Sequence, residues 1–225
     1  MVSRRGAAVN LLLNEVETRV LGALVEKEIT TPDYYPLSLN ALVNACNQRS
    51  NRDPVMNLDE DAVRQALDDL NAKGLAGARS GAESRVTKYE HRLQEAFNFS
   101  RPETAVLCVL LVRGPQTPGE LRSRSERMHR FEDLDGVQSA LHHLMKREPP
   151  LVKMLPRQPG TKEARYAHLL SGDVAAWEPA VATESSAGTS ADAERITRLE
   201  AELARLQAEV AELRQQLADF RKQFE

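Results

Sequence analysis

The chain has 225 residues and a formal net charge of −3 at neutral pH, and 28% of its residues are charged. Only 4% are aromatic, which predicts cores of Leu, Val and Ala, typical of packed helices with a small sheet. This composition excludes an all-β protein, and no apolar run approaches the ~20 residues of a membrane-spanning helix. The length is enough for two small domains.

The two cysteines and the N-terminal segment favour a cytoplasmic protein without a metal. Cys46 and Cys108 lie inside apolar helical patterns and lack the spacing of zinc ligands, so we expect both to be buried, reduced thiols. Residues 1–9 contain an arginine pair as some export signals do. However, the apolar stretch that follows is short and interrupted by Asn10, so we expect a disordered lead-in.

The sequence contains an internal repeat, which indicates the architecture before any motif is considered. Glu17-Thr18 and Val20-Leu21 recur as Glu103-Thr104 and Val106-Leu107, a shift of 86 residues. A later apolar pattern beginning at Val63 recurs from Val137. We therefore predict two copies of one unit, over residues 10–95 and 99–171.

Each copy reads as three helices followed by two short strands. In the first copy, Asn14 and Glu17 form a capping box for a helix that ends before Thr31-Pro32. A second helix begins near Ser38. The third runs from Asn57-Leu58-Asp59-Glu60 to Lys73-Gly74, and strands follow over residues 75–79 and 85–93.

The second copy repeats these signals. Ser100 and Glu103 open its first helix, and Thr117 and Glu120 form the capping box of the second. The third helix runs from Asp133-Leu134 to Lys146-Arg147, with strands over residues 151–155 and 164–170. Three helices and a β-hairpin predict a winged helix in each copy, so the fold class is mainly α with small β-hairpins (α+β). His91 and His168 fall on the strands, where we expect hydrogen-bonded side chains facing the core rather than metal ligands.

The C-terminal part of the chain differs from both copies. Residues 172–193 are rich in Ala, Ser, Thr and Gly and predict a flexible linker. Residues 194–225 carry a heptad pattern that predicts a coiled-coil helix and favours a homodimer. Parallel, antiparallel and intramolecular pairing all stay open. The predicted seam consists of Ile196, Leu199, Leu203, Leu206, Val210, Leu213, Leu217, Phe220 and Phe224.

Several long segments resemble one protein family. They are residues 30–38, 45–58, 85–90 and 113–124, which include Tyr34-Tyr35-Pro36, Ala45-Cys46-Asn47-Gln48 and Arg113-Gly114-Pro115-Gln116. Over roughly residues 10 to 175 the chain is similar to the YceH-like family of bacterial proteins. The resemblance implies a tandem winged-helix fold, and it brings no assigned activity, substrate or catalytic residue.

A winged helix commonly binds DNA, with its third helix in the major groove. Residues 10–95 carry a net charge of −4 and residues 99–171 a net charge of +4, so the second copy has the sign that phosphate contacts require. The alternative is that its basic residues are ordinary solubilising charges. The candidate nucleic-acid-binding residues are Arg49, Arg52, Lys88, Arg122, Arg124, Arg127, Arg130 and Arg165.

The third helix of the first copy is acidic and would be repelled by phosphates. Asp61, Asp68 and Asp69 either form a solvated acidic face or dock a basic protein partner. Two functions therefore stay open: a DNA-binding regulator that dimerises through the coil, and a protein–protein adaptor. We do not expect an enzyme or a cofactor, because the sequence has no nucleophile with a base, no carboxylate pair and no phosphate loop.

Overall fold

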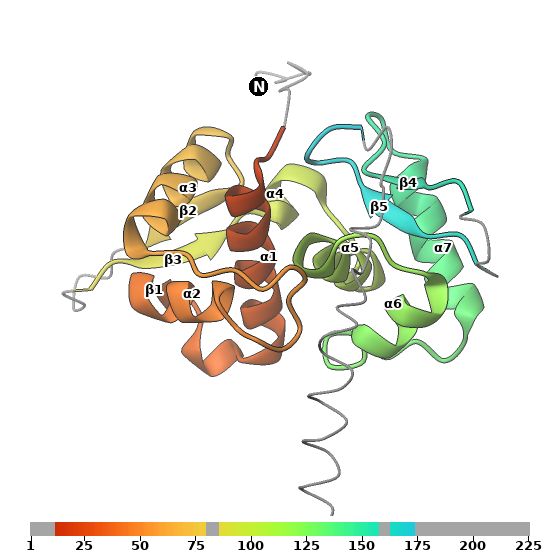
Figure 1. Cartoon of the computed structure of the whole chain (residues 1–225), viewed down its shortest axis with the longest axis horizontal. Coiled ribbons are helices and arrows are strands. Elements are labelled where there is room, and N and C mark those ends of the chain that lie inside the picture. The colour runs from red at the N-terminus through yellow and green to blue at the C-terminus, as the bar shows by residue number, and fades with distance from the viewer. Residues whose placement is uncertain (1–11, 80–85, 158–162, 174–225) are drawn as a thin grey trace, which may run out of the picture. The chain divides into compact units, whose positions relative to one another are not determined.

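The computed structural model describes residues 12–79, 86–157 and 163–173, which are mainly helical with two small antiparallel sheets (Figure 1). The predicted lead-in, the predicted linker from residue 174 onward and the predicted coil with its whole seam lie outside the described residues. We refer to the described residues up to Asn98 as the first half and those from Phe99 as the second half.

The first half begins with α1 (Glu15–Thr30), whose capping box forms as predicted. The Asn14 side chain accepts a hydrogen bond from the Glu17 backbone N–H at 2.8 Å, and the Glu17 carboxylate accepts one from the Asn14 N–H at 2.8 Å. The elements that follow are a 3₁₀ turn (Pro32–Tyr34), β1 (Leu37–Ser38), α2 (Leu39–Cys46), α3 (Glu60–Ala72), β2 (Ala76–Arg79), β3 (Lys88–His91) and α4 (Leu93–Phe97).

The second half repeats the order of three helices followed by two hairpin strands. Its elements are α5 (Arg101–Arg113), α6 (Pro118–Arg124), α7 (Leu134–Met145), β4 (Val152–Met154) and β5 (Tyr166–His168). The Thr117 hydroxyl accepts from the Glu120 N–H and the Glu120 carboxylate from the Thr117 N–H, so this capping box is also confirmed. The 3₁₀ turn, β1 and α4 are the three described elements that the sequence patterns did not predict.

The two sheets are related by the repeat. The first has the strand order β1-β3-β2, with Leu37 opposite Tyr89, and the second pairs β4 with β5. In the second half a single bridge between Gln116 and Tyr166 takes the place of the β1–β3 pairing. Since Tyr89 and Tyr166 are equivalent in the repeat, the last strand of each copy is contacted on both sides, although the second sheet has two strands and the first has three.

The buried side chains of both halves form one continuous core. It is centred on α1 and α5, which lie side by side between the remaining helices (Figure 1). Residues 20–25 of α1 and 105–112 of α5 are buried almost without interruption. The buried side chains of the two copies are therefore joined in one core.

Polar contacts also tie each first helix to its surroundings. The Glu17 carboxylate binds the Lys73 ammonium at 2.6 Å, and the equivalent Glu103 lies 3.6 Å from the Arg147 guanidinium. In both copies, therefore, the glutamate that caps the first helix also binds the basic residue just after the third.

Candidate nucleic-acid interface

Helix α7 presents a polar surface opposite its buried side. Val137, Ala140, Leu141 and Leu144 pack into the core. Three polar residues, Gln138, Ser139 and His142, are exposed on the outer side. His142 lies four positions after Gln138 and three after Ser139, so its side chain neighbours both of theirs on the helix surface. Amide and hydroxyl side chains of this kind hydrogen-bond to base edges in a major groove.

The start of α7 is fixed by its cap. The Asp133 carboxylate accepts a hydrogen bond from the Gly136 N–H at 2.9 Å, which satisfies a donor at the helix N-terminus. Asp135 is the acidic side chain within the exposed side of the helix. A carboxylate at such a position would accept from cytosine, whereas near a phosphate it would repel.

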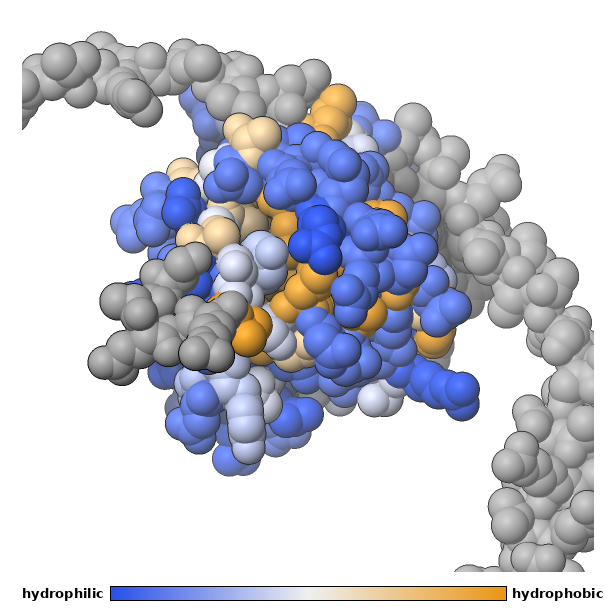
Figure 2. Space-filling model, turned by 90° about the vertical axis from the view of Figure 1, so that its left-hand side faces the viewer, coloured by the Kyte–Doolittle hydropathy of each residue, from blue (hydrophilic) through white to orange (hydrophobic). Residues whose placement is uncertain are grey.

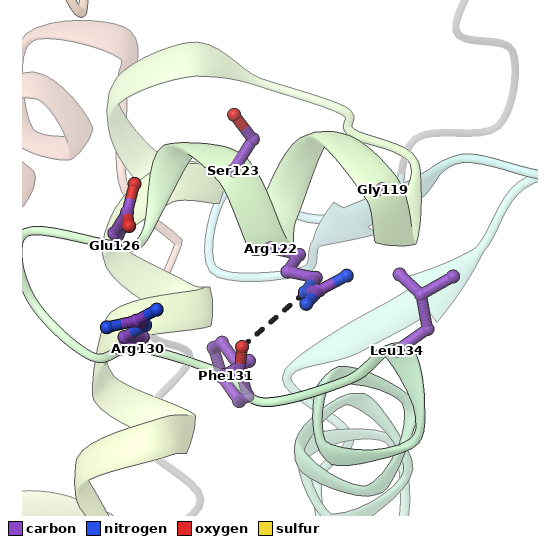
Figure 3. Close-up of a pocket in the computed structure, with 7 residues that line it drawn as sticks. All are labelled: Gly119, Arg122, Ser123, Glu126, Arg130, Phe131 and Leu134. Carbon is purple, nitrogen blue, oxygen red and sulfur yellow. Dashed lines mark hydrogen bonds between the residues drawn. The ribbon is translucent and has the colours of Figure 1, made fainter.

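A cavity of about 440 Å³ lies between α6 and the start of α7. Arg122 and Arg130 line it together with Phe131 and Leu134 (Figure 3). The Arg122 guanidinium donates to the Phe131 carbonyl at 3.4 Å and to the Glu132 carbonyl at 2.6 Å, so it is held beside the loop that leads into α7. Arg130 is exposed and makes no hydrogen bond or ion pair with any described residue.

A second surface hollow, of about 610 Å³, follows the polar side of α7 itself. Asp135, Gln138, Ser139 and His142 of α7 line it together with Tyr166 of β5. The hairpin thus borders the exposed side of α7, and Arg122 and Arg130 lie beside the start of the same helix.

The predicted arginine cluster does not act as one set. Arg122 and Arg130 line the cavity beside α7, whereas Arg124 and Arg127 line a different cavity that faces α1 and α5. Arg124 also donates to Gln116 and lies 3.5 Å from the Glu120 carboxylate.

Arg165 binds the Glu120 carboxylate at 2.8 Å and the Pro115 carbonyl at 2.9 Å. Its guanidinium is therefore engaged within the second half.

The candidates of the first half fall into two classes. Arg49 and Lys88 are exposed. Arg52 is 5% exposed, and its guanidinium binds the Glu26 carboxylate at 2.5 Å and the Ala45 carbonyl at 2.8 and 3.0 Å. A side chain held in this way is part of the core and does not reach a ligand outside it.

The acidic candidates lie on α3. Asp61 and Asp68 are exposed, while Asp69 is half-buried and accepts a hydrogen bond from Gln65 at 3.1 Å. The outer side of α3 is therefore acidic where that of α7 is mostly neutral. This contrast between equivalent helices was visible in the sequence. The polar residues of α7 could have been found the same way, by setting aside its buried positions.

Both cysteines and His91 belong to the core, whereas His168 is half-buried and His142 and His143 are exposed on α7. The Nδ1 of His91 accepts a hydrogen bond from the Leu93 N–H, so its Nε2 carries the proton and donates to the Glu28 carboxylate at 2.8 Å, which confirms a hydrogen-bonded core histidine. His168 differs, because its Nδ1 is buried without a hydrogen-bond partner among the described residues.

Burial raises the pKa of the Cys46 thiol to about 12 and also raises the pKa of the Cys108 thiol. Neither thiol is a nucleophile near neutral pH.

No group of three or more potential metal ligands is found within residues 12–79, 86–157 and 163–173. In the same part of the chain, no helix combines the length and apolar character that would let it span a bilayer.

Comparison with known proteins gives a single family. The family described as "Protein of unknown function, DUF480" matches residues 13–161. A UPF0502 protein of Koribacter versatilis is 58% identical over 195 residues, which cover 87% of this chain and 90% of the relative. A UPF0502 protein of Solibacter usitatus is 58% identical over 192 residues, covering 85% and 91%. One of Opitutus terrae is 60% identical over 164 residues, covering 72% and 71%. The YceH-like resemblance is consistent with this family.

Proposed function

We propose that this chain, which belongs to the DUF480 family, is a non-enzymatic DNA-binding protein whose second half contacts the duplex through α7. In this proposal each half is a winged helix, and the two form a tandem pair. The observation that carries it is the outer side of α7, where Gln138, Ser139 and His142 are exposed, with Arg122 and Arg130 beside the start of the same helix. Winged helices place the equivalent helix in the major groove.

The arginines next to α7 supply the second element of the proposal. Arg122 and Arg130 line the cavity between α6 and α7, close to the start of α7, the helix that would enter the major groove (Figure 3). Arginine at this place neutralises phosphates and fixes the register of the helix on the duplex. Their contribution would be independent of sequence, whereas that of Gln138 and His142 would depend on the bases.

Self-association completes the proposed arrangement. A parallel coil formed by residues 194–225 would bring two second halves to one duplex. Linking two binding units raises their effective concentration for each other, so the dimer would bind more tightly than an isolated chain.

The test is a fluorescence anisotropy titration of the full chain with a random-sequence duplex at low and moderate salt. We expect micromolar binding that weakens steeply with salt. Arg130→Ala should weaken it roughly uniformly across sequences. Arg64→Ala, an exposed arginine on the equivalent helix α3, is the matched control and should leave binding unchanged. Absence of binding at low salt, or equal loss in both variants, would reject the proposal.

Sequence preference is tested separately. The variant Gln138→Ala with His142→Ala should retain non-specific binding and lose discrimination among duplexes selected from a random pool. Each base contact that is removed should reduce discrimination by about 1–3 kcal/mol. If wild-type protein selects no sequence, α7 is not a reading helix.

The acidic side of α3 favours a second candidate, a protein–protein adaptor. Asp61 and Asp68 are exposed there, and they would attract a basic protein. Figure 2 shows this end of the first half, where hydrophilic side chains dominate and hydrophobic ones show between them. A partner recovered equally well after nuclease treatment, and lost in Asp61→Asn with Asp68→Asn, would support this function. A partner lost on nuclease treatment would instead support DNA tethering.

A further inference from the structure

A cavity of about 350 Å³ lies where the two halves meet. Its walls come from the C-terminal part of α1, the loop after α2, the C-terminal part of α5, and α6 with the loop that follows. A volume of this size is within the range of small-ligand sites. The cavity is distinct from the two beside α7, and the DNA-binding proposal does not use it.

The charged side chains around this cavity are unbalanced. Arg113, Arg124 and Arg127 line it, together with two acids, Glu26 and Glu126. Glu26 is already paired, because the buried Arg52 guanidinium binds it at 2.5 Å. The three lining arginines therefore outnumber Glu126, which is the remaining acid among the lining residues.

The three arginines come from separate parts of the chain and are held in different ways. Arg113, near the end of α5, donates to the Asn51 side chain of the first half. Arg124 is anchored from the other side by Gln116 and lies 3.5 Å from the Glu120 carboxylate, which is outside the cavity lining. Arg127 is exposed and has no hydrogen bond or ion pair with a described residue. Two fixed guanidinium groups and one unengaged group thus border the same space.

The electrostatic cost of this arrangement is visible at Arg113. Its pKa is lowered, first by burial and then by the positive charges of Arg124 and Arg52, with a partial offset from Asp53 and Glu26. Like charges brought together in this way are stabilised by an anion that binds between them. Guanidinium groups match the oxygen geometry of phosphate.

We propose that this cavity binds a small phosphate-bearing anion through Arg113, Arg124 and Arg127. The ligand would contact both halves of the chain, since Asn51 holds Arg113 from the first half, and α6 and the loop after it contribute Arg124 and Arg127. Phosphate is preferred to a carboxylate because three guanidinium groups around one space can satisfy several oxygens at once.

The test is isothermal titration of the full chain with inorganic pyrophosphate. Arg127→Ala should weaken binding roughly tenfold or more, since it removes a charge-assisted hydrogen bond. Because Arg127 is exposed and unbonded, this variant should fold normally. Arg113→Gln should weaken binding at least as much. Arg101→Ala, at the other end of α5, is the matched control and should bind like the wild type.

Titrations with ADP and with sulfate show which class of anion the cavity prefers. Binding of ADP more tightly than pyrophosphate, with the same dependence on Arg127, assigns the site to a nucleotide; equal affinities assign it to the phosphate groups alone. Sulfate should bind much more weakly than pyrophosphate. If pyrophosphate and ADP both fail to bind, or if Arg127→Ala and Arg101→Ala bind them alike, the proposal is wrong. DNA binding through α7 can succeed or fail independently of either result.

Discussion

The Cys108 thiol donates a hydrogen bond to the Gly22 carbonyl oxygen over 3.5 Å, and these two residues are separated by 86 positions, the shift of the repeat. The first helices of the two copies therefore meet at equivalent positions. Gly22 allows this approach because a Cβ at that position would lie 2.7 Å from Val112 Cγ1 and 3.0 Å from Leu111 Cβ.

The first prediction concerns this contact. Gly22→Val should lower the free energy of unfolding by about 3 kcal/mol, because the added carbons overlap with α5. Urea denaturation followed by circular dichroism measures the change. Gly119→Ala is the control, since the nearest atoms to its Cβ would be 3.9 Å away. It should leave stability unchanged or raise it by up to about 1 kcal/mol. Equal midpoints for Gly22→Val and wild type would contradict the packing.

The second prediction concerns Arg52. Arg52→Met should destabilise the protein by about 3–5 kcal/mol, because the Glu26 carboxylate and the Ala45 carbonyl lose their buried partner. Arg49→Ala, three residues earlier and exposed, should change stability by less than about 0.5 kcal/mol. Thermal unfolding of both variants under the same buffer conditions decides the matter. Similar melting temperatures for the two would show that the Arg52 network is not stabilising.

The third prediction is a pH dependence. Burial lowers the pKa of His168 from 6.5 to about 4, so the unfolded chain takes up a proton at a higher pH than the folded one. Stability is then fully present above pH 6.5 and falls as the pH drops toward 4. Between pH 7 and pH 5 the loss should be about 2 kcal/mol.

His168→Leu should make this pH profile shallower. Chemical denaturation at several pH values above 5 is the suitable measurement. Below that range Glu28, Glu103 and Glu120, whose pKa values are lowered by their hydrogen bonds and basic neighbours, add their own loss on protonation. An unchanged slope in the variant would mean that His168 is not the titrating group.

The fourth prediction concerns the heptad segment, which lies outside the described residues. Removing residues 194–225 should reduce the mass in sedimentation equilibrium from that of a dimer to that of a monomer. Circular dichroism of the shortened chain should still show a folded protein, since none of the described core residues is removed. A wild-type monomer, or a shortened dimer, would contradict the predicted coil.

Local features of the fold were predictable and long-range ones were not. Asn14, Ser100, Thr117 and Asp133 were read correctly as helix starts because a cap depends on residues three positions away. Gly22 carries no such signal. In sequence it is only a poor helix former, and its role appears when α5 packs against it.

The candidate site shows the same division. Arg52 follows Arg49 in a polar stretch, and both were predicted to bind nucleic acid. In the structure, however, the chain after α2 buries the Arg52 guanidinium, which binds the Glu26 carboxylate. Likewise, nothing local indicates that Arg122 and Arg124, two positions apart on α6, border separate cavities. The net charge of the second half could be counted from the sequence. Which partner or cavity each charged side chain faces depends on tertiary packing.

The shared core of α1 and α5 limits how the protein can be dissected. A fragment ending near residue 98 would leave the α5-facing side of α1 in water, and a fragment starting there would do the same to α5. Duplicated units that bury their surfaces against each other in this way become mutually dependent. Neither half is a portable module, and a gene fusion or truncation meant to transfer one of them would have to carry both.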